Sequence, residues 1–223
     1  MSFEQLYASP IQHPWLLWAS ALLGLLVALS KRGLSRQVRA FCVALTVLSL
    51  LDAWLTADSV LGVGPLEGVA ASLVPLLFVL LGDFRYFFLI EAARADGTLA
   101  VGRTTVAIAA AWTSVVPIGS QLVVHAIGSE EPRVLFLVYE TLFVMLSLGL
   151  YAAYLPRHAR AVRWTRRVTL FVLIYYGSWA FADAVILHSS ADAGFLVRML
   201  PNVLYYGGFV PAVAWTAPRA APK

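Results

Sequence analysis

Charged side chains within long apolar stretches are the residues of this sequence that could do chemistry. A carboxylate or guanidinium among apolar groups must be paired, hydrated or neutralised by a proton, because an isolated buried charge is very costly. Such groups suit the binding of a proton, a cation or a polar solute. The candidates for a transport or ligand pathway are Asp52, Asp83, Arg85, Glu140 and Asp183, together with the amide of Asn202.

Aromatic side chains with a polar tip lie close to these candidates in the last third of the chain. Rings of this kind either pack in a protein core or line a ligand site, and their position leaves both roles open. We expect an aromatic pocket formed by Tyr176, Trp179, Tyr205 and Tyr206.

Histidine and carboxylate side chains could hold zinc or iron, which makes a membrane-embedded, metal-dependent lipid enzyme an alternative. His125, His188 and Glu140 are weak candidates, because no two histidines have the i, i+4 spacing that makes such a signal specific. The motifs of a P-loop, a zinc protease and a serine hydrolase are absent. The sequence therefore predicts no cofactor and favours a protein that is not an enzyme.

The composition defines the surroundings of these residues. Of the 223 residues, 61% are hydrophobic and 13% are charged, whereas soluble domains average about 45–50% and about 25%. An ordinary soluble fold is excluded, because so much apolar surface would leave large patches exposed to water. The single cysteine, Cys42, excludes an internal disulfide and a thiolate metal cage.

Seven stretches are long and apolar enough to cross a membrane, which takes about 20 residues in a helix. Short connections with glycine, proline or charged residues separate them, and no length remains for a folded soluble domain. We expect one all-α domain over residues 1–223, with spans at about 14–30, 40–61, 69–90, 104–127, 134–155, 168–188 and 195–215.

The distribution of lysine and arginine predicts the orientation of these spans. Thirteen of the sixteen basic residues fall in one set of loops and in the C-terminal tail, whereas Arg133 and Arg198 fall on the opposite side. Positively charged loops stay in the cytoplasm. We therefore expect an outside N-terminus and a cytoplasmic C-terminus in the plasma membrane of a bacterium, its inner membrane. The basic loops suit anionic lipid headgroups and give no reason to expect a nucleic acid partner.

Polar residues recur at helical spacing and mark the helix faces that turn toward the bundle interior. The first predicted helix lacks such a stripe, so we expect it at the lipid-facing edge. Glu140, Asp183 and Asn202 fall in the outer half, and Asp83 and Arg85 in the inner half, which predicts a polar outer vestibule above a charged inner closure. The stripes are Ser49, Asp52, Thr56 and Ser59; Ser72, Asp83 and Tyr86; Ser114, Gln121 and His125; Glu140, Ser147, Tyr151 and Tyr154; Tyr176, Trp179, Asp183 and Ser190; and Arg198, Asn202, Tyr205, Tyr206 and Phe209.

Asp83 and Arg85 are separated by one residue, so on a helix their side chains point about 200° apart. Each needs a partner on another helix, or Arg85 must extend toward the cytoplasmic headgroups. A pairing of Arg85 with Asp52 or Asp183 would link helices into a gate.

Seven spans with an outside N-terminus invite comparison with the rhodopsins, which hold retinal on a lysine of the last helix. The only lysines are Lys31 and Lys223, and both fall in predicted cytoplasmic segments. A covalent retinal is therefore excluded, whereas a noncovalent ligand among the aromatic residues is not.

Two parts of the sequence align without gaps and suggest a parallel repeat. Placing Asp52 on Asp183 also pairs Arg36 with Arg167. The layout resembles that of the SWEET sugar transporters, in which two three-helix units flank a linker helix and the substrate binds near the midplane. The resemblance covers this 3+1+3 layout rather than a motif, since the sequence has no Pro-Gln dipeptide.

The leading hypothesis from the sequence is a small-solute or proton- or cation-linked transporter with a carboxylate-lined central path. Its partners would be the lipid bilayer and a small polar solute or ion, and the sequence permits a homo-oligomer. A seven-helix receptor, sensor or assembly protein without transport is the first alternative, and the metal-dependent lipid enzyme is the second.

Overall fold

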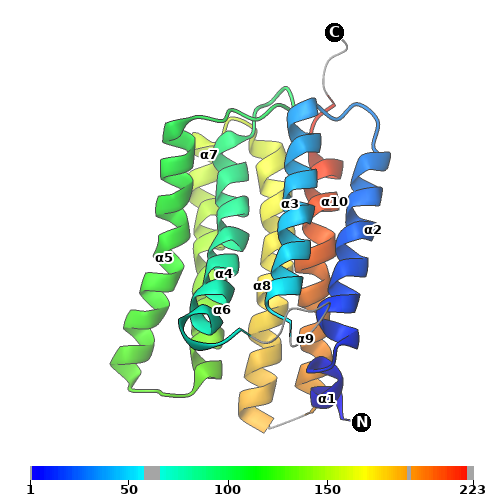
Figure 1. Cartoon of the computed structure of the whole chain (residues 1–223). Helices are drawn as coiled ribbons and strands as arrows, with labels where there is room; N and C mark the ends of the chain where they lie inside the picture. The colour runs from blue at the N-terminus through cyan, green and yellow to red at the C-terminus, as the bar shows by residue number, and fades with distance from the viewer. Residues whose placement is uncertain (1, 58–65, 190–191, 220–223) are drawn as a thin grey trace.

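A computed structural model of the chain describes residues 2–57, 66–189 and 192–219. These residues form helices and no strand, as Figure 1 shows. Three segments, labelled η, have the wider π-helical turn. The elements are α1 (Phe3–Tyr7), η1 (Ile11–Leu16), α2 (Leu17–Ser30), α3 (Arg36–Leu55), α4 (Gly68–Ala92), α5 (Arg103–Ile127), α6 (Pro132–Gly149), η2 (Leu150–Tyr154), α7 (Leu155–His158), α8 (Val162–Ser189), α9 (Ala193–Val203), η3 (Leu204–Gly208) and α10 (Phe209–Thr216).

Six helices in the described part of the chain are long and apolar enough to cross a membrane. They are Ile11–Ser30, Arg36–Leu55, Gly68–Ala92, Arg103–Ile127, Pro132–His158 and Val162–His188, and they coincide with six of the seven predicted spans. The last predicted span is also helical, because α9, η3 and α10 follow one another without a break from Ala193 to Thr216. Its apolar character is weaker because Arg198, Asn202 and two tyrosines interrupt it.

The predicted bounds of the second span need a correction. The span was expected to reach Leu61, but α3 ends at Leu55, and the hydroxyl of the following Thr56 donates to the Asp52 carbonyl at 2.6 Å. Asp52 therefore lies in the last turn of α3. Ser59 and Ser190, which were assigned to interior stripes, fall outside the described residues.

The helices form an elongated bundle with the two termini at opposite ends (Figure 1). Elements adjacent in the chain pack against each other from α2 to α9, and the final run also contacts α2, α3 and α8. The principal contacts of α2 are with α3 and with this final run rather than with α4. They do not outline a separate first three-helix unit, so the packing gives the predicted 3+1+3 repeat no support.

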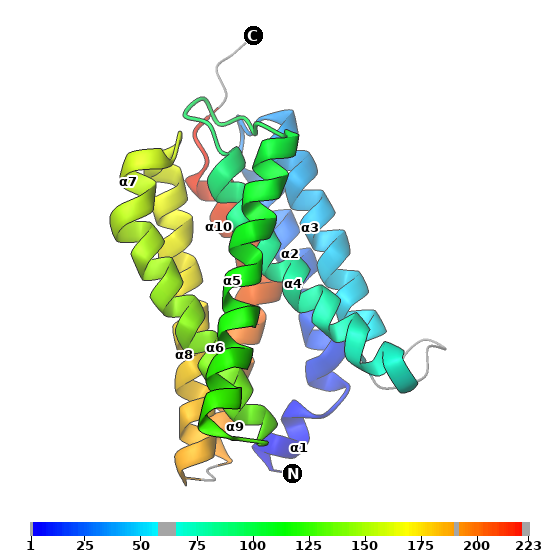
Figure 2. The same ribbon diagram turned by 90° about the vertical axis from the view of Figure 1, so that its left-hand side faces the viewer.

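Helix α4 leaves the bundle along its first half. Figure 2 shows its N-terminal end leaning away from the other helices, and Val69 and Leu73 on this stretch are exposed. Its second half is buried and carries Asp83 and Arg85. The interior polar residues of α4 are therefore confined to the part that packs in the bundle, and Ser72, expected on the interior stripe, is exposed.

The interior stripe predicted for residues 104–127 is wrong. Ser114, Gln121 and His125 are all exposed, and the buried face of α5 consists of Ala109, Thr113, Val116 and Ser120. Small side chains allow close helix packing in a membrane. The Ser114 hydroxyl donates to the Ala110 carbonyl at 3.0 Å, so it needs no partner in the interior, and the other two lie within the last two turns of the helix.

Four other predicted polar stripes have buried members among the described residues. These are Ser49 and Asp52 on α3, Glu140 and Ser147 on α6, Tyr176 and Asp183 on α8, and Tyr205 and Phe209 in the final run.

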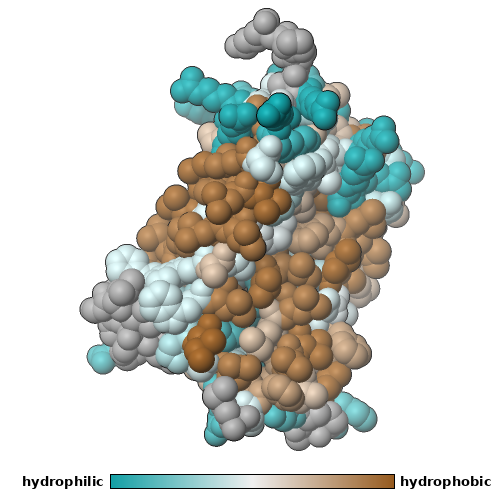
Figure 3. Space-filling model, turned by 90° about the vertical axis from the view of Figure 1, so that its right-hand side faces the viewer, coloured by the Kyte–Doolittle hydropathy of each residue, from teal (hydrophilic) through white to brown (hydrophobic). Residues whose placement is uncertain are grey.

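Apolar side chains cover the middle of the bundle surface. Figure 3 shows a broad hydrophobic region on one face and the most hydrophilic residues gathered at the end that holds the C-terminus. Exposed Leu23, Leu26 and Leu122 belong to such apolar surface. This surface is compatible with a membrane-embedded protein.

Glycine permits the closest helix contact in the bundle. A Cβ atom added at Gly24 of α2 would lie 2.1 Å from the backbone oxygen of Gly207 in η3, and Ala21 and Ala28 extend the same buried face. The other face of α2 is exposed. The first helix therefore lies at the edge, as expected, but one side of it is packed tightly by small residues.

We expect Gly24→Ala to destabilise the protein by about 1–3 kcal/mol, because the added methyl group meets backbone rather than a movable side chain. The matched control is Gly177→Ala in α8, where an added Cβ meets nothing within 4 Å and a gain of about 0.5–1 kcal/mol is expected. Thermal unfolding in detergent measures both. Equal melting temperatures for the two variants would contradict this account of the α2–η3 contact.

Candidate functional site

The charged residues inside the bundle form two groups. The ion cluster consists of Arg133, Glu140, Asp183 and Arg198 and lies toward the end that holds the N-terminus. The central cluster consists of Asp52, Asp83 and Arg85 with the tyrosines that surround them. The ion cluster draws on α6, α8 and α9, and the central cluster draws on α3, α4, α6, α8 and η3.

The ion cluster joins α6, α8 and α9. Both Arg133 and Arg198 donate to one oxygen of Asp183, with an Arg133 Nη1 to Asp183 Oδ1 distance of 3.0 Å, and Arg198 Nη1 lies 3.7 Å from Glu140 Oε1. Asp183 is 0% exposed and Glu140 is 4% exposed. Two guanidiniums face two carboxylates, so the formal charges balance, although Glu140 Oε2 and Asp183 Oδ2 are buried without a hydrogen-bond partner in the described part of the chain.

The short N-terminal helix α1 closes the ion cluster. The backbone N–H groups of Phe3 and Glu4 donate to Asp192 at 2.8 Å each, which anchors α1 beside α9. The Tyr7 hydroxyl then accepts hydrogen bonds from Arg198 Nε at 3.0 Å and from Asn202 Nδ2 at 3.4 Å. Residues before the first predicted span therefore take part in the interior polar network.

In the central cluster, Asp83 is held by two tyrosines from other helices. The hydroxyls of Tyr139 on α6 and Tyr176 on α8 both donate to its carboxylate, one to each oxygen. Asp83 is 1% exposed. A buried carboxylate with two hydroxyl donors has the hydrogen bonds that its burial requires.

Arg85 points to a different side of α4, toward the final run of helix. Its Nη2 donates to the Tyr205 carbonyl at 2.9 Å, and the guanidinium carbon lies 3.9 Å from the Tyr205 ring centre and 4.5 Å from that of Phe209. Cation–π contacts of this kind are strengthened by desolvation. The two neighbouring charges therefore find partners on different helices, as their 200° separation predicts.

Asp52 forms the third corner of the central cluster. Its carboxylate accepts a hydrogen bond from the Tyr206 hydroxyl at 2.7 Å. Arg85 lies close enough to Asp52 and to Asp83 to attract both electrostatically, although no carboxylate of the described residues lies within 4.0 Å of its guanidinium. The expected gate pairing of Arg85 with Asp52 is thus a longer-range attraction, and Asp183 is engaged elsewhere.

The four residues of the predicted aromatic pocket do meet. The ring centres of Trp179 and Tyr205 are 5.2 Å apart, those of Tyr176 and Trp179 are 5.4 Å apart, and those of Tyr205 and Tyr206 are 5.1 Å apart. Tyr176 also stacks on Phe143 at 3.8 Å. These rings fill the space between the ion cluster and the central cluster, and Trp179 Nε1 donates to Asn202 Oδ1 at 2.9 Å.

A polar cavity of about 280 Å³, the Gln12 cavity, opens at the N-terminal end of the bundle. It is lined by Tyr7, Ala8, Pro10, Gln12, His13, Thr56, Ala57 and Asn202. The Thr56 hydroxyl donates to the Asp52 carbonyl at 2.6 Å, so the cavity ends within one helical turn of Asp52 in the central cluster. Of the residues expected to line a vestibule here, Asn202 does so, whereas Asp183 is covered by its two arginines.

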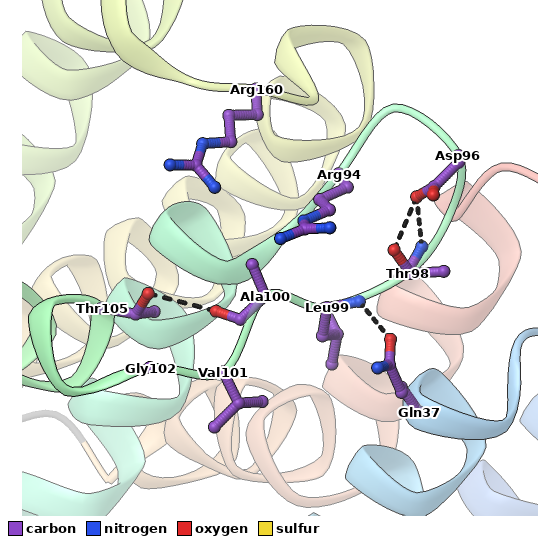
Figure 4. A pocket seen from close by; sticks show the side chains of 10 residues that line it. All are labelled: Gln37, Arg94, Asp96, Thr98, Leu99, Ala100, Val101, Gly102, Thr105 and Arg160. Carbon is purple, nitrogen blue, oxygen red and sulfur yellow. Dashed lines mark hydrogen bonds between the residues drawn. The ribbon is translucent and has the colours of Figure 1, made fainter.

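A second, wider pocket of about 650 Å³, the Arg94 pocket, lies at the opposite end. Figure 4 shows the Arg94 and Arg160 guanidiniums pointing into it from the α4–α5 loop and from the segment before α8. The loop is held by Leu99 N–H donating to Gln37 Oε1 at 2.7 Å and by Thr98 donating twice to Asp96. Two of the basic residues predicted for these loops therefore line one depression.

The weak metal candidates are not brought together. His125 and His188 are exposed, whereas Glu140 is buried in the ion cluster. In the described part of the chain, no three His, Cys, Asp or Glu side chains are grouped so that they could hold a metal ion.

Four participants lie outside the sequence-based prediction: Tyr7, Gln12, Arg133 and Tyr139. Tyr139 lies one residue from Glu140, which defines the predicted stripe, and its i, i+4 spacing to the aromatic Phe143 is a usable signal. Arg133 falls in a predicted loop, and Tyr7 lies before the first predicted span. Gln12 precedes the predicted first span, and no local pattern marks it.

Comparisons with protein-family models, with curated proteins and with solved structures find no match to this chain. The predicted resemblance to the SWEET layout therefore has no support from a family or structural match. Function has to be inferred from the residues of the chain itself.

We expect Arg198→Gln to destabilise the protein by about 3–5 kcal/mol, because it leaves buried Glu140 without a cation and Asp183 with one. Adding Glu140→Gln should restore part of the lost unfolding free energy, since the double variant no longer buries the unpaired Glu140 carboxylate. Arg32→Gln, at an exposed loop position, is the control and should be neutral. Thermal unfolding of the parent, both single variants, the double variant and the control measures the coupling, and strict additivity of the two substitutions would contradict the pairing.

Hydrogen bonds from the Thr98 side chain, and next from its backbone N–H, lower the pKa of Asp96 in the α4–α5 loop. This contribution to loop stability is present above the ordinary Asp pKa and is lost as the pH falls through the lowered value. In Thr98→Val the pKa of Asp96 should rise part of the way back, because the backbone donor remains. Carbon-detected NMR titration of the carboxyl group measures this, and an unchanged pKa would exclude the hydroxyl as the main cause.

Proposed function

We propose that this protein is a small transporter of the bacterial inner membrane that moves a proton, a cation or a small polar solute along a central polar path. The central cluster is the observation that supports this. Asp52, Asp83 and Arg85 are all buried, and a charge at the middle of a membrane costs about 2.5–3.5 kcal/mol on insertion scales. Intramembrane ionisable groups of this kind are typical of ion and solute pathways.

The proposal includes seven spans, with the run Ala193–Thr216 as the last. This run is continuous, packs against α2, α3 and α8, and is long enough to cross a bilayer at 1.5 Å per residue. Its polar residues face the ion cluster and the central cluster rather than lipid. With thirteen basic residues on the C-terminal side, the positive-inside rule orients the N-terminus outward.

The path would begin at the Gln12 cavity, on the outer side in this orientation. From Thr56 at its inner limit it would pass Asp52 and Tyr206, reach Arg85, and continue to Asp83 between Tyr139 and Tyr176. Arg85 attracts both carboxylates from beyond ion-pair distance, and a proton or cation that neutralises either carboxylate would weaken that attraction. The stacked rings of Tyr176 and Phe143 would then form the closed part of the path.

A ligand-binding receptor or sensor is the second candidate. The observation that favours it is the dense aromatic packing around Tyr176, Trp179 and Tyr205, since ring centres 3.8–5.4 Å apart leave the interior closed. A protein of this kind would bind its ligand in the Gln12 cavity and pass on no solute.

Flux measurements in proteoliposomes test the transport proposal. We expect pH-dependent proton or solute flux, followed with an entrapped pH dye and by osmotic light scattering, and at least a tenfold loss in Asp52→Asn and Asp83→Asn. The control is Glu130→Gln, an exposed loop position. Size-exclusion profiles of all variants should match that of the parent protein.

Unchanged flux in both aspartate variants would remove the central cluster from the mechanism. Ligand binding without any flux in the parent protein would favour the receptor.

A further inference from the structure

The Gln12 cavity contains a buried amide that the protein leaves unused. The Gln12 side chain lines the cavity and is 2% exposed, yet its Nε2 has no hydrogen-bond partner in the described part of the chain. Buried polar groups in native proteins are nearly always paired, and an unpaired donor is costly. This amide therefore points to a partner that comes from outside the fold.

The Tyr7 hydroxyl offers a second donor to the same cavity. Its oxygen already accepts from Arg198 Nε at 3.0 Å and from Asn202 Nδ2 at 3.4 Å. A hydroxyl oxygen accepts at most two hydrogen bonds, so its own proton is the part left for a ligand. A hydrogen bond from a cation polarises this group and makes its proton a better donor.

Two side-chain acceptors around the cavity are already engaged. Asn202 Oδ1 accepts from Trp179 Nε1 at 2.9 Å, and His13 Nε2 lies 3.0 Å from the Ala53 carbonyl oxygen and 3.2 Å from Thr56 Oγ1. The donors that remain available to a ligand are the Gln12 amide and the Tyr7 hydroxyl. A ligand suited to these two donors carries oxygen acceptors.

The lining also indicates the charge and size of the ligand. No carboxylate, lysine or arginine is among the described lining residues, and the nearest guanidinium, Arg198, is paired with Asp183. A volume of about 280 Å³ is at the small end for ligand pockets and equals the liquid volume of about nine water molecules. The cavity thus fits an uncharged solute of roughly ten non-hydrogen atoms.

We propose that the Gln12 cavity binds a small uncharged solute with several oxygen acceptors, of the polyol type, through Gln12 Nε2 and the Tyr7 hydroxyl. Passage of this solute onward past Asp52 rests on the proposed transport function, whereas its binding does not.

Protection of an introduced cysteine tests the binding. Cys42 is buried, so Ala8→Cys in the cavity lining supplies the reactive thiol, and Ala193→Cys, an exposed position outside the lining, is the matched control. The protein in nanodiscs is labelled with an impermeant methanethiosulfonate in the presence of sorbitol or of gluconate, which has a similar chain but bears a carboxylate. We expect sorbitol to slow labelling of Ala8→Cys several-fold and to leave Ala193→Cys unaffected.

Two results would overturn the proposal at this step. One is the absence of any protection by sorbitol. The other is stronger protection by gluconate than by sorbitol, which would mean that the cavity selects an anion.

Gln12→Met in the Ala8→Cys background separates a binding role from a structural one. Methionine fills a similar volume without donors, so the sorbitol concentration needed for half protection should rise about tenfold, the worth of one hydrogen bond. Because Nε2 has no partner in the protein, the melting temperature should stay the same or rise. A lower melting temperature, or unchanged protection, would overturn the proposal.

The flux assay distinguishes this inference from the proposed function. If sorbitol protects Ala8→Cys but no flux is found in proteoliposomes, the transport proposal is rejected and the binding proposal stands. If a solute or proton flux is found but sorbitol does not protect Ala8→Cys, the binding proposal is rejected and the transport proposal stands.

Discussion

A charge placed among apolar helices must be met by a partner from another helix, and the rest of this structure depends on that constraint. Asp83 obtains its partners from α6 and α8, Arg85 obtains its partners from η3 and α10, and Asp183 is held by α6 and α9. Each of these contacts ties two different helical elements together, and most of them join elements that are distant in sequence. Lipid offers no competing hydrogen bonds, so the polar groups decide which helix faces come together while the apolar faces only need to stay outside.

The final run of helix, Ala193–Thr216, is less apolar than the other spans because it supplies polar partners for both clusters. It is the least apolar of the predicted spans, and it carries partners for both clusters: Arg198 and Asn202 toward the N-terminal end, Tyr205 and Tyr206 in the middle. Its π-type segment η3 supplies the carbonyl that Arg85 binds, and irregular helix turns are frequent where a side chain enters the backbone ladder or where a site is built. Gly207 in the same segment allows α2 to approach, so one short stretch serves packing and polar contacts together.

The two clusters differ in their balance of positive and negative charge. In the ion cluster two guanidiniums balance the charge of two carboxylates. In the central cluster one guanidinium attracts two carboxylates that are each held by tyrosines, so a proton or cation could shift the balance. The Gln12 cavity ends beside this second cluster, and its unused donors give the N-terminal end a role that the charges alone would not have suggested.

The amino-acid sequence by itself determined an all-helical chain, six helices long and apolar enough to cross a membrane, and most of the interior polar residues, because hydropathy and helical spacing are local properties of the chain. It also predicted that Asp83 and Arg85 need different partners. Local patterns could not tell which helix supplies each partner, since Tyr139, Arg133 and Gln12 acquire their roles only through contacts with distant segments. The wrong prediction for α5 has a similar origin. The Ser114 hydroxyl donates to the Ala110 carbonyl of its own helix, so its position in the sequence gave no information about the bundle interior. Only the tertiary structure could separate polar residues whose hydrogen bonds come from other helices from those whose hydrogen bonds stay within their own helix.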